Sequence, residues 1–512
     1  MGEAKRRNIL STKVLLSPAG SDGFVETPSG KVHINWDSKS SVTPFGQMAY
    51  FIEFLNMTGL FSGWVNSCPL EYTSPNAPCK LDFLGTWLLS ILSGHKRYAH
   101  VTSIKGDGVN PDLLGMKKIL SEDSLRRGLS KIPEDTGICW LQEHLEHSVL
   151  PLLKASWILD VDTTVKPLYG KQEGAVVGYN PTKPGRPSHT YHTYLVAGLR
   201  LVLDAEVHAG NQSHSNHTLP GLLRILDKLA PEKRPYIVRG DAGFGTDRII
   251  TELETRSQNY LFKLRLTKKV RQYIEKSFYR QGWADAGSGW EGLDGEIKLS
   301  GWDTKRHVVM LRRQIHGEII LQDSKQDFFG FIEENQPAKR YEYAILVTNL
   351  EDEIHTIAQL YRDRADAENN FDELKNHWGW GGFTTQDLHR CQLSVRAVAL
   401  IYNWWSLFVR LANPQIRHEA ITSRPLLLTA IAEKTQHARK TNLTITPMHG
   451  KGAKAKSMLE AVSNLLKRLK ISAEQLNLIS VWEAVCNHLI LILTKFEWKR
   501  TRICHKKNAV AG

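Results

Sequence analysis

The chain has 512 residues, 41% of them hydrophobic and 23% charged, a balance typical of a globular protein with several domains rather than a disordered or fibrous one. Its 66 Lys and Arg residues against 53 Asp and Glu residues give a formal charge of +13, which favours a polyanionic partner such as a nucleic acid. Six cysteines without a C-x-x-C pair argue against a cysteine-rich zinc module or a disulfide framework, and no apolar stretch is long enough to cross a bilayer.

The N-terminal part carries mostly helical periodicity, as in DFLGTWLLSILSG, and its first residues lack the apolar core of a secretion signal. We therefore expect an intracellular protein with a helical N-terminal region that binds DNA. The stretch NPDLLGMKKILSEDSLRRGLSKI predicts two short helices joined near Ser121, with Ser121 or Ser124 as the cap of the second. Arg126 and Arg127 make this pair basic, so a DNA-docking helix-turn-helix and a merely solvated helix pair both remain open.

The pattern changes at residue 157. WILDVDTTVKPLY, YHTYLVAGLRL and LVLDAEVHAG predict three successive strands, followed by a helix in LPGLLRILDKLA and a fourth strand in PYIVRGDAGFG. A second helix, DRIITELETRS, and a fifth strand, NYLFKLRL, come next. Strand, strand, strand, helix, strand is the order of an RNase H-like core, so we expect an α/β fold with a mixed sheet flanked by helices.

Alternating, glycine-interrupted runs such as GEIKLSGW, RHVVMLRRQI, GEIILQD and DFFGFIE then predict an antiparallel β insertion, and helices return after YEYAILVTNL. The expected organisation is a helical N-terminal region (1–155), a first core part (156–269), the insertion (270–345), a second core part (346–415) and a helical basic C-terminal region (416–512).

Three carboxylates stand at positions where such a fold would bring them together. Asp162 lies on the first predicted strand, Asp241 ends the fourth, and Glu368 lies on a later helix. Three adjacent carboxylates suit hard divalent cations, which prefer oxygen ligands. Asp160, on the same strand face as Asp162, and Asp372, close to Glu368 on the helix, are the alternatives.

The stretch YRDRADAENNFDELKNHWGWGG predicts one long helix over residues 361–382. On a helical wheel, Tyr361, Arg364, Glu368 and Lys375 fall within about 60° of one another, so they share one stripe. A solvated face laced with charge pairs is the ordinary interpretation of such a run.

These four residues, with two, three and six residues between them, resemble the Y-R-E-K signature of bacterial insertion-sequence DDE transposases. DVDTT and RGDAGFG resemble the first and second Asp motifs of that family, and a β insertion between the second Asp and the Glu is also typical of it. The resemblance covers roughly residues 157–405.

The resemblance implies that Asp162, Asp241 and Glu368 hold two Mg²⁺, with Mn²⁺ as a substitute, and that the enzyme cuts the ends of its element and joins them to target DNA. Arg364 and Lys375 would then hold phosphates, and Tyr361 would contact the DNA backbone or stack near the cut. The implied partners are terminal inverted repeats, target DNA and a second copy of the chain in a homodimeric synaptic complex. The implied location is the bacterial cytoplasm, with nucleoid association when DNA is bound. A catalytically inactive DNA-binding protein derived from such a transposase is the alternative.

Four further features are less specific. Lys171, Lys183, Arg186 and His189 lie in a loop beside the first strand that either holds DNA or is an exposed hairpin. His208, His214 and His217 have no cysteine or carboxylate at a metal-ligand spacing, so loop histidines are the better interpretation. Trp283, Trp290 and Trp302 either wedge against a flipped base or, as we expect, pack the insertion. Lys451, Lys454 and Lys456 fit a mobile phosphate-binding arm and a solvated linker equally well.

Overall fold

The computed structural model describes residues 23–153, 156–181, 183–212, 214–315, 328–331, 339–476 and 480–508. Its centre is an 11-stranded mixed sheet whose main path runs β10-β11-β12-β14-β9-β8-β4-β6-β5, with β13 paired to β14 and β7 paired to β6. The strands are β4 (Ile158–Pro167), β5 (Val176–Val177), β6 (Pro187–Val196), β7 (Leu201–Ala209), β8 (Ile237–Gly240), β9 (Tyr260–Lys263), β10 (Ala284–Gly287), β11 (Trp290–Ile297), β12 (Arg306–Gln314), β13 (Phe328–Phe331) and β14 (Lys339–Thr348).

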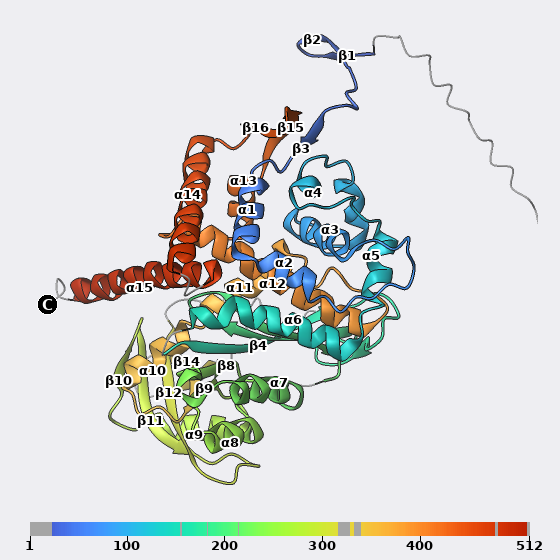
Figure 1. The fold of residues 1–512 in the computed structure, drawn as a ribbon. Coiled ribbons are helices and arrows are strands. Elements are labelled where there is room, and N and C mark those ends of the chain that lie inside the picture. The colour runs from blue at the N-terminus through green and yellow to red at the C-terminus, as the bar shows by residue number, and fades with distance from the viewer. Residues whose placement is uncertain are drawn as a thin grey trace, which may run out of the picture.

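The expected mixed sheet flanked by helices is confirmed. The three predicted strands β4, β6 and β7 form antiparallel pairs, whereas β8 and β9 add to β4 in parallel, so the order across this part is β7-β6-β4-β8-β9. The two predicted helices are α7 (His214–Lys228), which begins before the expected start at Leu219, and α8 (Asp247–Thr255). Figure 1 shows both helices in the lower half of the molecule beside β8 and β9.

The strands expected in the insertion are present where the structure describes it, and they extend the core sheet. β14 pairs with the core strand β9 and with β12, which continues the sheet to β11 and β10. DFFGFIE contains β13, GEIILQD lies outside the described residues, and the region opens with a helix that the sequence pattern did not indicate, α9 (Lys268–Ser277).

The two faces of the sheet carry different helices because side chains alternate along each strand. Ile237 and Leu261 belong to a small apolar cluster with Ile357 of α10 (Ile354–Arg362). Val238 and Phe262, on the opposite face, belong to the main core with the buried residues of α7 and α8. Asp160 and Asp162 follow the alternation of Ile158 and therefore lie on the α10 face.

Helix α12 (Leu388–Ala412) covers the outer edge of β7. The side-chain amide of Gln392 exchanges two hydrogen bonds with the backbone of Val207, and Asn403 does the same with Val202. Gln392 and Asn403 are 11 residues apart on the helix, and Val207 and Val202 are five residues apart on the strand; both separations are roughly 16 Å. The two side-chain amides therefore reach the two ends of the same strand edge. An unpaired strand edge is thereby satisfied by side chains.

The remaining helices lie mainly in the upper half of Figure 1. They are α1 (Met48–Thr58), α2 (Leu60–Asn66), α3 (Lys80–Leu92), α4 (Asn110–Leu113), α5 (Glu122–Leu129), α6 (Glu134–Val149), α11 (Ala365–His377), α13 (Ala420–Leu427), α14 (Gly452–Leu476) and α15 (Val481–Asn508), with short 3₁₀ turns η1 (Tyr98–Ile104), η2 (Leu150–Leu152) and η3 (Pro231–Lys233). Within the described part of the chain, no helix is both long and apolar enough to cross a membrane.

Both terminal regions contain strands that helical periodicity did not predict. β1 (Phe24–Thr27) and β2 (Gly30–His33) form a hairpin, and β3 (Ser41–Thr43) pairs with β15 (Ala430–His437), which pairs with β16 (Lys440–Pro447). The segment expected to be a linker is also ordered, because Lys454 and Lys456 lie in the first turns of α14.

Candidate active site

Strands β4 and β8 bring Asp162 and Asp241 to the same region of the sheet. The strands pair in parallel with a constant offset of 79 residues, and the same offset separates Asp162 from Asp241, which directly follows β8. The backbone N–H of Gly243 donates to Asp241 Oδ1 at 2.8 Å, so a tight turn holds this carboxylate just past the strand end.

Asp162 lies in a partly buried and electrically crowded place, with 16% of its side chain exposed. Burial raises the pKa of Asp162 to about 6, and the negative charge of Asp241 adds to the increase. Arg364, the backbone N–H of Thr163 and Lys375 oppose this shift because each stabilises the charged form. These influences place Asp241, Arg364 and Lys375 around Asp162.

The predicted long helix is divided at this point. α10 ends at Arg362 and α11 begins at Ala365, and the N–H of Arg364 bonds to Tyr361 three residues back instead of four. The prediction of one helix over residues 361–382 is therefore wrong, although Arg364 keeps right-handed helical dihedrals. α11 itself ends at His377.

Arg364 links two of the three carboxylates. Its guanidinium lies 2.9 Å from Asp162 Oδ2 and 3.7 Å from Glu368 Oε1. Only 7% of the Arg364 side chain is exposed, whereas 71% of the Glu368 side chain is exposed. Glu368 therefore approaches the site from the solvent side.

The negative charges of all three acids act on the hydroxyl of Tyr361. Burial raises the pKa of its hydroxyl to about 12, and Asp241, Glu368 and Asp162 each contribute to the increase, against the effect of Arg364. Tyr361 on α10 and Glu368 on α11 therefore both lie near Arg364, on either side of the break between the two helices. The last member of the expected stripe, Lys375, is exposed and acts on Asp162.

The donor set fits a hard divalent cation, because three carboxylates supply oxygen ligands. Their oxygens do not form a group in which one atom from each acid lies within 4.8 Å of the other two. Across the part of the chain that the structure describes, the only three His, Cys, Asp or Glu side chains with all ligand atoms within 4.8 Å of one another are His192, Glu206 and His208.

The alternative ligand Asp160 is occupied elsewhere. Both of its oxygens bind the guanidinium of Arg239 at 2.7 Å, and only 1% of either side chain is exposed. Arg239 also donates to the carbonyl of Leu360 at the end of α10. Asp160 thus anchors α10 to the sheet through Arg239.

The alternative on α11, Asp372, is exposed and accepts a hydrogen bond from Asn376 Nδ2 at 2.7 Å. Its neighbour Glu373 is buried and binds Arg417 at 2.7 Å and the backbone N–H of Ala420 at 2.9 Å. Glu373 therefore ties α11 to α13, and sequence reasoning had not assigned it this role.

The predicted DNA-contacting loop gathers around an exposed aromatic ring. Lys183 donates to the hydroxyl of Tyr169, and its ammonium lies 5.0 Å from the ring centroid, while Arg186 lies 4.6 Å from the same centroid. Lys171 is also exposed, but His189 is buried and bonds to the carbonyl of Glu173. β4 continues for five residues beyond Asp162, roughly 17 Å, so this loop lies at the far end of the strand from the acids.

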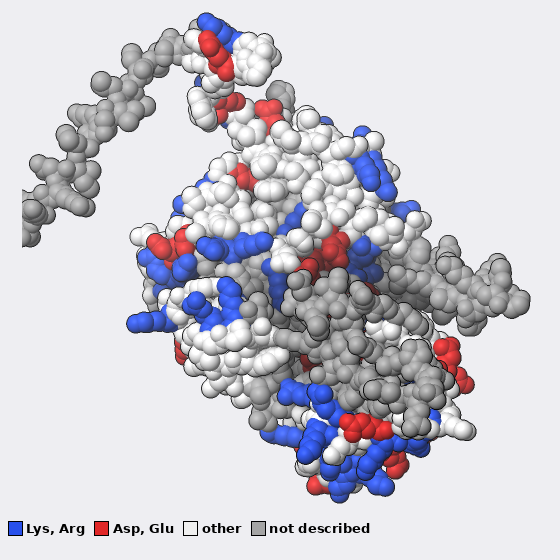
Figure 2. All heavy atoms as spheres, turned by 180° about the vertical axis from the view of Figure 1, so that it is seen from behind, with Lys and Arg blue, Asp and Glu red and all other residues white. Residues whose placement is uncertain are grey.

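The predicted helix-turn-helix lacks a full first helix, since α4 has only four residues. The expected cap is present, because Ser121 accepts the backbone N–H of Ser124 at 3.3 Å at the start of α5. On α5, Arg126 binds Glu122 at 2.5 Å and lies over the Tyr98 ring, and Arg127 donates to the carbonyl of Asp123. Figure 2 shows Lys and Arg side chains in several separate groups on one face of the molecule, with acidic side chains near its centre.

Two predictions about other side chains have different outcomes. The interpretation of His208 as a loop residue without a carboxylate partner is wrong, because His208 lies on β7 and its Nε2 is 3.3 Å from Glu206 Oε2. The side chain of His214 lies outside the described residues.

The expected packing role of the insertion tryptophans is supported by their contacts, since Trp302, Trp283 and Trp290 each face an arginine of β12.

Comparison with known proteins gives one strong result. A family model described as transposase DDE domain group 1 matches residues 116–470. No curated protein matches the chain. Among solved structures, a piggyBac transposase in a synaptic complex with hairpin DNA, determined by cryo-electron microscopy, is 10% identical with a TM-score of 0.35, covering 84% of each chain, a likeness too weak to bear on function.

Proposed function

Since the chain belongs to the transposase DDE domain group 1 family, we propose that it is a DNA transposase that cuts its element at the ends and inserts it into target DNA. The observation that carries this proposal is the approach of Asp162, Asp241 and Glu368 around Arg364. The acids come from β4, from the turn after β8 and from α11, so the fold must form before they meet.

Asp162, Asp241 and Glu368 are the residues that would hold two Mg²⁺, or Mn²⁺ in their place. When bound, such ions activate a water or a 3′-hydroxyl and stabilise the leaving oxygen of a phosphodiester. Burial is the main cause of the raised pKa of Asp162, and the charge of Asp241 adds to it, so a bound cation would offset a cost that both acids bear in its absence.

The basic members of the stripe would position the DNA strand. The guanidinium of Arg364 lies between Asp162 and Glu368, where it would also meet a phosphate oxygen of the strand held by these acids. Lys375 is exposed and adds a second positive charge, and Tyr361 would contact the backbone next to the cut. Lys171, Lys183 and Arg186 would hold the duplex farther along, together with Arg126 and Arg127.

Several finer assignments belong to the same proposal. The strand order β7-β6-β4-β8-β9 supports an RNase H-like core, and the stripe supports the Y-R-E-K signature of insertion-sequence transposases. The DNA partners would be the terminal inverted repeats and a target, held by a homodimer in the bacterial cytoplasm. An inactive DNA-binding descendant is the second candidate, but it would need none of the three acids.

Strand cleavage and joining provide the direct test. A DNA carrying the inverted repeats that flank the reading frame is incubated with the full-length protein in Mg²⁺ and separately without it. We expect Mg²⁺-dependent cleavage and joining by the wild type, and at least about a hundredfold loss in Glu368→Gln, the scale seen when one charge-stabilising group is removed.

Asp372→Asn is the matched control, because it removes an exposed acid from the same helix. We expect this variant to cleave as fast as the wild type, because the Asp372 carboxylate is bonded to Asn376 and is not among the charged groups that act on Asp162 or Tyr361. Equal activity in wild type and Glu368→Gln would refute the site, and DNA binding without cleavage by the wild type would favour the inactive descendant.

A further inference from the structure

A second group of metal-ligand side chains lies on the opposite face of the sheet from Asp162. His192 on β6 stands opposite Glu206 on β7 in the strand register, and His208 follows two residues later on the same face. One ligand atom from each residue lies within 4.8 Å of the other two. On its other side, His192 pairs with Thr163 of β4. The Thr163 side chain points away from the face that carries Asp162, because side chains alternate along a strand.

The distance between two of these ligand atoms matches that around one tetrahedral ion. Ligand atoms about 2.05 Å from a tetrahedral zinc lie roughly 3.3 Å from one another. Glu206 Oε2 and His208 Nε2 are 3.3 Å apart, and the ring centroids of His192 and His208 are 4.5 Å apart. A third ring, His217 in the first turn of α7, has its centroid 5.8 Å from that of His208.

Neighbouring groups orient two of the three ligands. Thr218 Oγ1 lies 2.7 Å from His192 Nδ1, and in the tautomer protonated on Nδ1 the lone pair of His192 is on Nε2. The hydroxyl of Tyr194 donates to Glu206 Oε2 at 3.3 Å and to the carbonyl of Thr218 at 2.9 Å. The contact of Thr218 with the outer nitrogen of His192 is of the kind typical of protein metal sites, and Tyr194 fixes the position of the Glu206 carboxylate.

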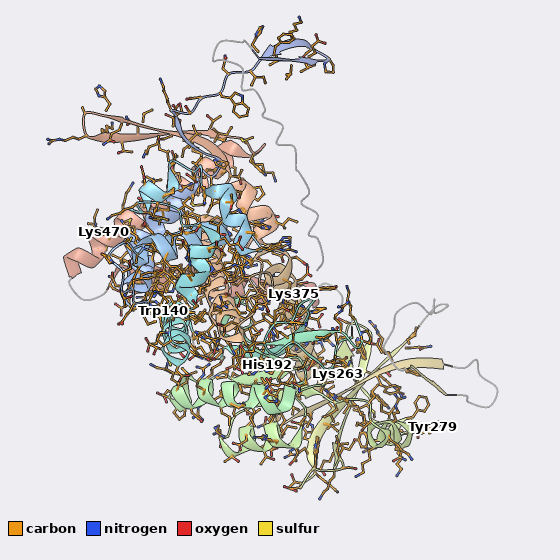
Figure 3. All side chains as sticks on the ribbon, turned by 90° about the vertical axis from the view of Figure 1, so that its right-hand side faces the viewer. Trp140, His192, Lys263, Tyr279, Lys375 and Lys470 are labelled. Atoms are coloured by element: carbon orange, nitrogen blue, oxygen red, sulfur yellow. The ribbon has the colours of Figure 1, made fainter. Side chains whose placement is uncertain are left out.

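We propose that His192, Glu206 and His208 bind a Zn²⁺ ion beside α7, with the fourth position facing His217. Two imidazoles and one carboxylate are a donor set that zinc uses and that Mg²⁺ avoids, so this site differs in chemistry from the three acids at Asp162. The ion ties β6 and β7 to the start of α7. Figure 3, which labels both residues, shows His192 at the level of the sheet, below Lys375 of α11.

The competing explanation is a hydrogen-bonded ion pair between His208 and Glu206 with no metal. Both explanations account for the 3.3 Å distance. They differ in zinc content, in the effect of zinc on thermal stability and in the effect of Thr218, which acts only as a positioning residue for His192.

The test uses the untagged full-length protein, stripped with a chelator, given one equivalent of Zn²⁺ in excess Mg²⁺ and separated from free metal by gel filtration. We expect one zinc per chain by elemental analysis, a rise in Tm on zinc addition and the visible absorption of tetrahedral Co²⁺ after substitution. His208→Asn and Glu206→Gln should lose all three signals. Asp162→Asn should keep them, because its change is confined to the other face.

Thr218→Val supplies a variant that keeps every ligand. Loss of an outer-shell hydrogen bond typically weakens metal affinity by about 10- to 100-fold, so we expect a zinc dissociation constant raised to that extent. A wild type that retains no zinc, a His208→Asn variant that retains it, or an Asp162→Asn variant that loses it would each overturn the proposal.

Discussion

Among single residues, Arg364 has the central position in the candidate active site, because its positive charge lies between two of the acids. Its guanidinium touches Asp162 and approaches Glu368, so it neutralises part of the repulsion among the acids. Burial nevertheless dominates at Asp162, whose pKa is raised to about 6. Asp162 therefore holds its proton to a higher pH than an exposed carboxyl does, in spite of the positive charge beside it.

The raised pKa of Asp162 predicts a pH-dependent stability difference. The folded protein holds this proton more tightly than the unfolded chain, so the group costs stability as pH rises from about 4 to about 6, and the full cost remains above pH 6. Asp162→Asn removes the cost, and we expect its free energy of unfolding relative to wild type to rise by about 2 kcal/mol between pH 4.5 and pH 7.5. Urea denaturation at the two pH values measures this difference. The same difference at both pH values would contradict the assignment, and Asp372→Asn is the control expected to show none.

The second prediction concerns the contribution of Asp160 to the free energy of unfolding, not to catalysis. Asp160→Asn leaves the buried guanidinium of Arg239 without its charge partner, which costs about 3–5 kcal/mol for pairs of this kind. Asp366→Asn, in an ion pair with Arg200 whose acid is 49% exposed, is the matched control and should cost less than about 1 kcal/mol. Urea unfolding of both variants decides between them, and equal costs would show that the Asp160 pair is not structural.

At the scale of elements, strands were predicted better than helix ends and hairpins. β4, β6, β7 and β8 were readable because strong apolar runs end at Gly or Asp. The hairpin β15–β16 was missed because its turn uses Ala438 and Arg439, both with positive φ, where the usual signal is Asn-Gly. The break between α10 and α11 left no signal either, since Arg364 keeps helical dihedrals.

The candidate site was predictable only in part, for a similar reason. The four stripe residues follow one local period, so their common face could be inferred. The buried pairs of Asp160 with Arg239 and of Glu373 with Arg417 join residues far apart in the sequence. The group of His192, Glu206 and His208 also depends on strand register, although Glu206 and His208 already show the two-residue spacing of one strand face.

The contact between α7 and the sheet gives a prediction at this scale. A Cβ on Gly221 would lie 2.6 Å from Glu206 Oε1 and closer still to the Tyr194 hydroxyl. Gly221→Ala should therefore destabilise the protein by about 1–3 kcal/mol through overpacking, and it should displace Glu206. Thermal unfolding checks the first effect.

Gly63→Ala is the matched control, since Gly63 lies in α2 and the nearest atom to its added Cβ is 3.9 Å away. Alanine is the better helix former, so we expect a gain of about 0.5–1 kcal/mol there. Stabilisation by both substitutions would mean that α7 stands farther from β6 and β7 than described.

At the scale of the whole molecule, the expected regions are joined by one core. Trp64 of α2 stacks on Trp140 of α6 with centroids 5.6 Å apart and meets Trp404 of α12 edge-on at 5.7 Å. β3, from the N-terminal region, pairs with β15 of the C-terminal region. Helices α2 and α6 of the N-terminal region are thus built into the same core as α12.

This integration predicts how a truncated chain behaves. A fragment of residues 156–415 keeps the candidate acids but loses α6, whose Ser148 accepts a hydrogen bond from the indole of Trp404 at 2.9 Å. It would expose Trp404 and the other apolar side chains of α12 that the N-terminal helices cover. Because burying one large side chain contributes about 1.5–3 kcal/mol and whole domains are stable by only about 5–15 kcal/mol, we expect this fragment not to fold. Circular dichroism and calorimetry of the fragment test the prediction. The full-length chain should melt with its central core as one unit, and a cooperative transition in the fragment would show that the sheet and its acids form an independent domain.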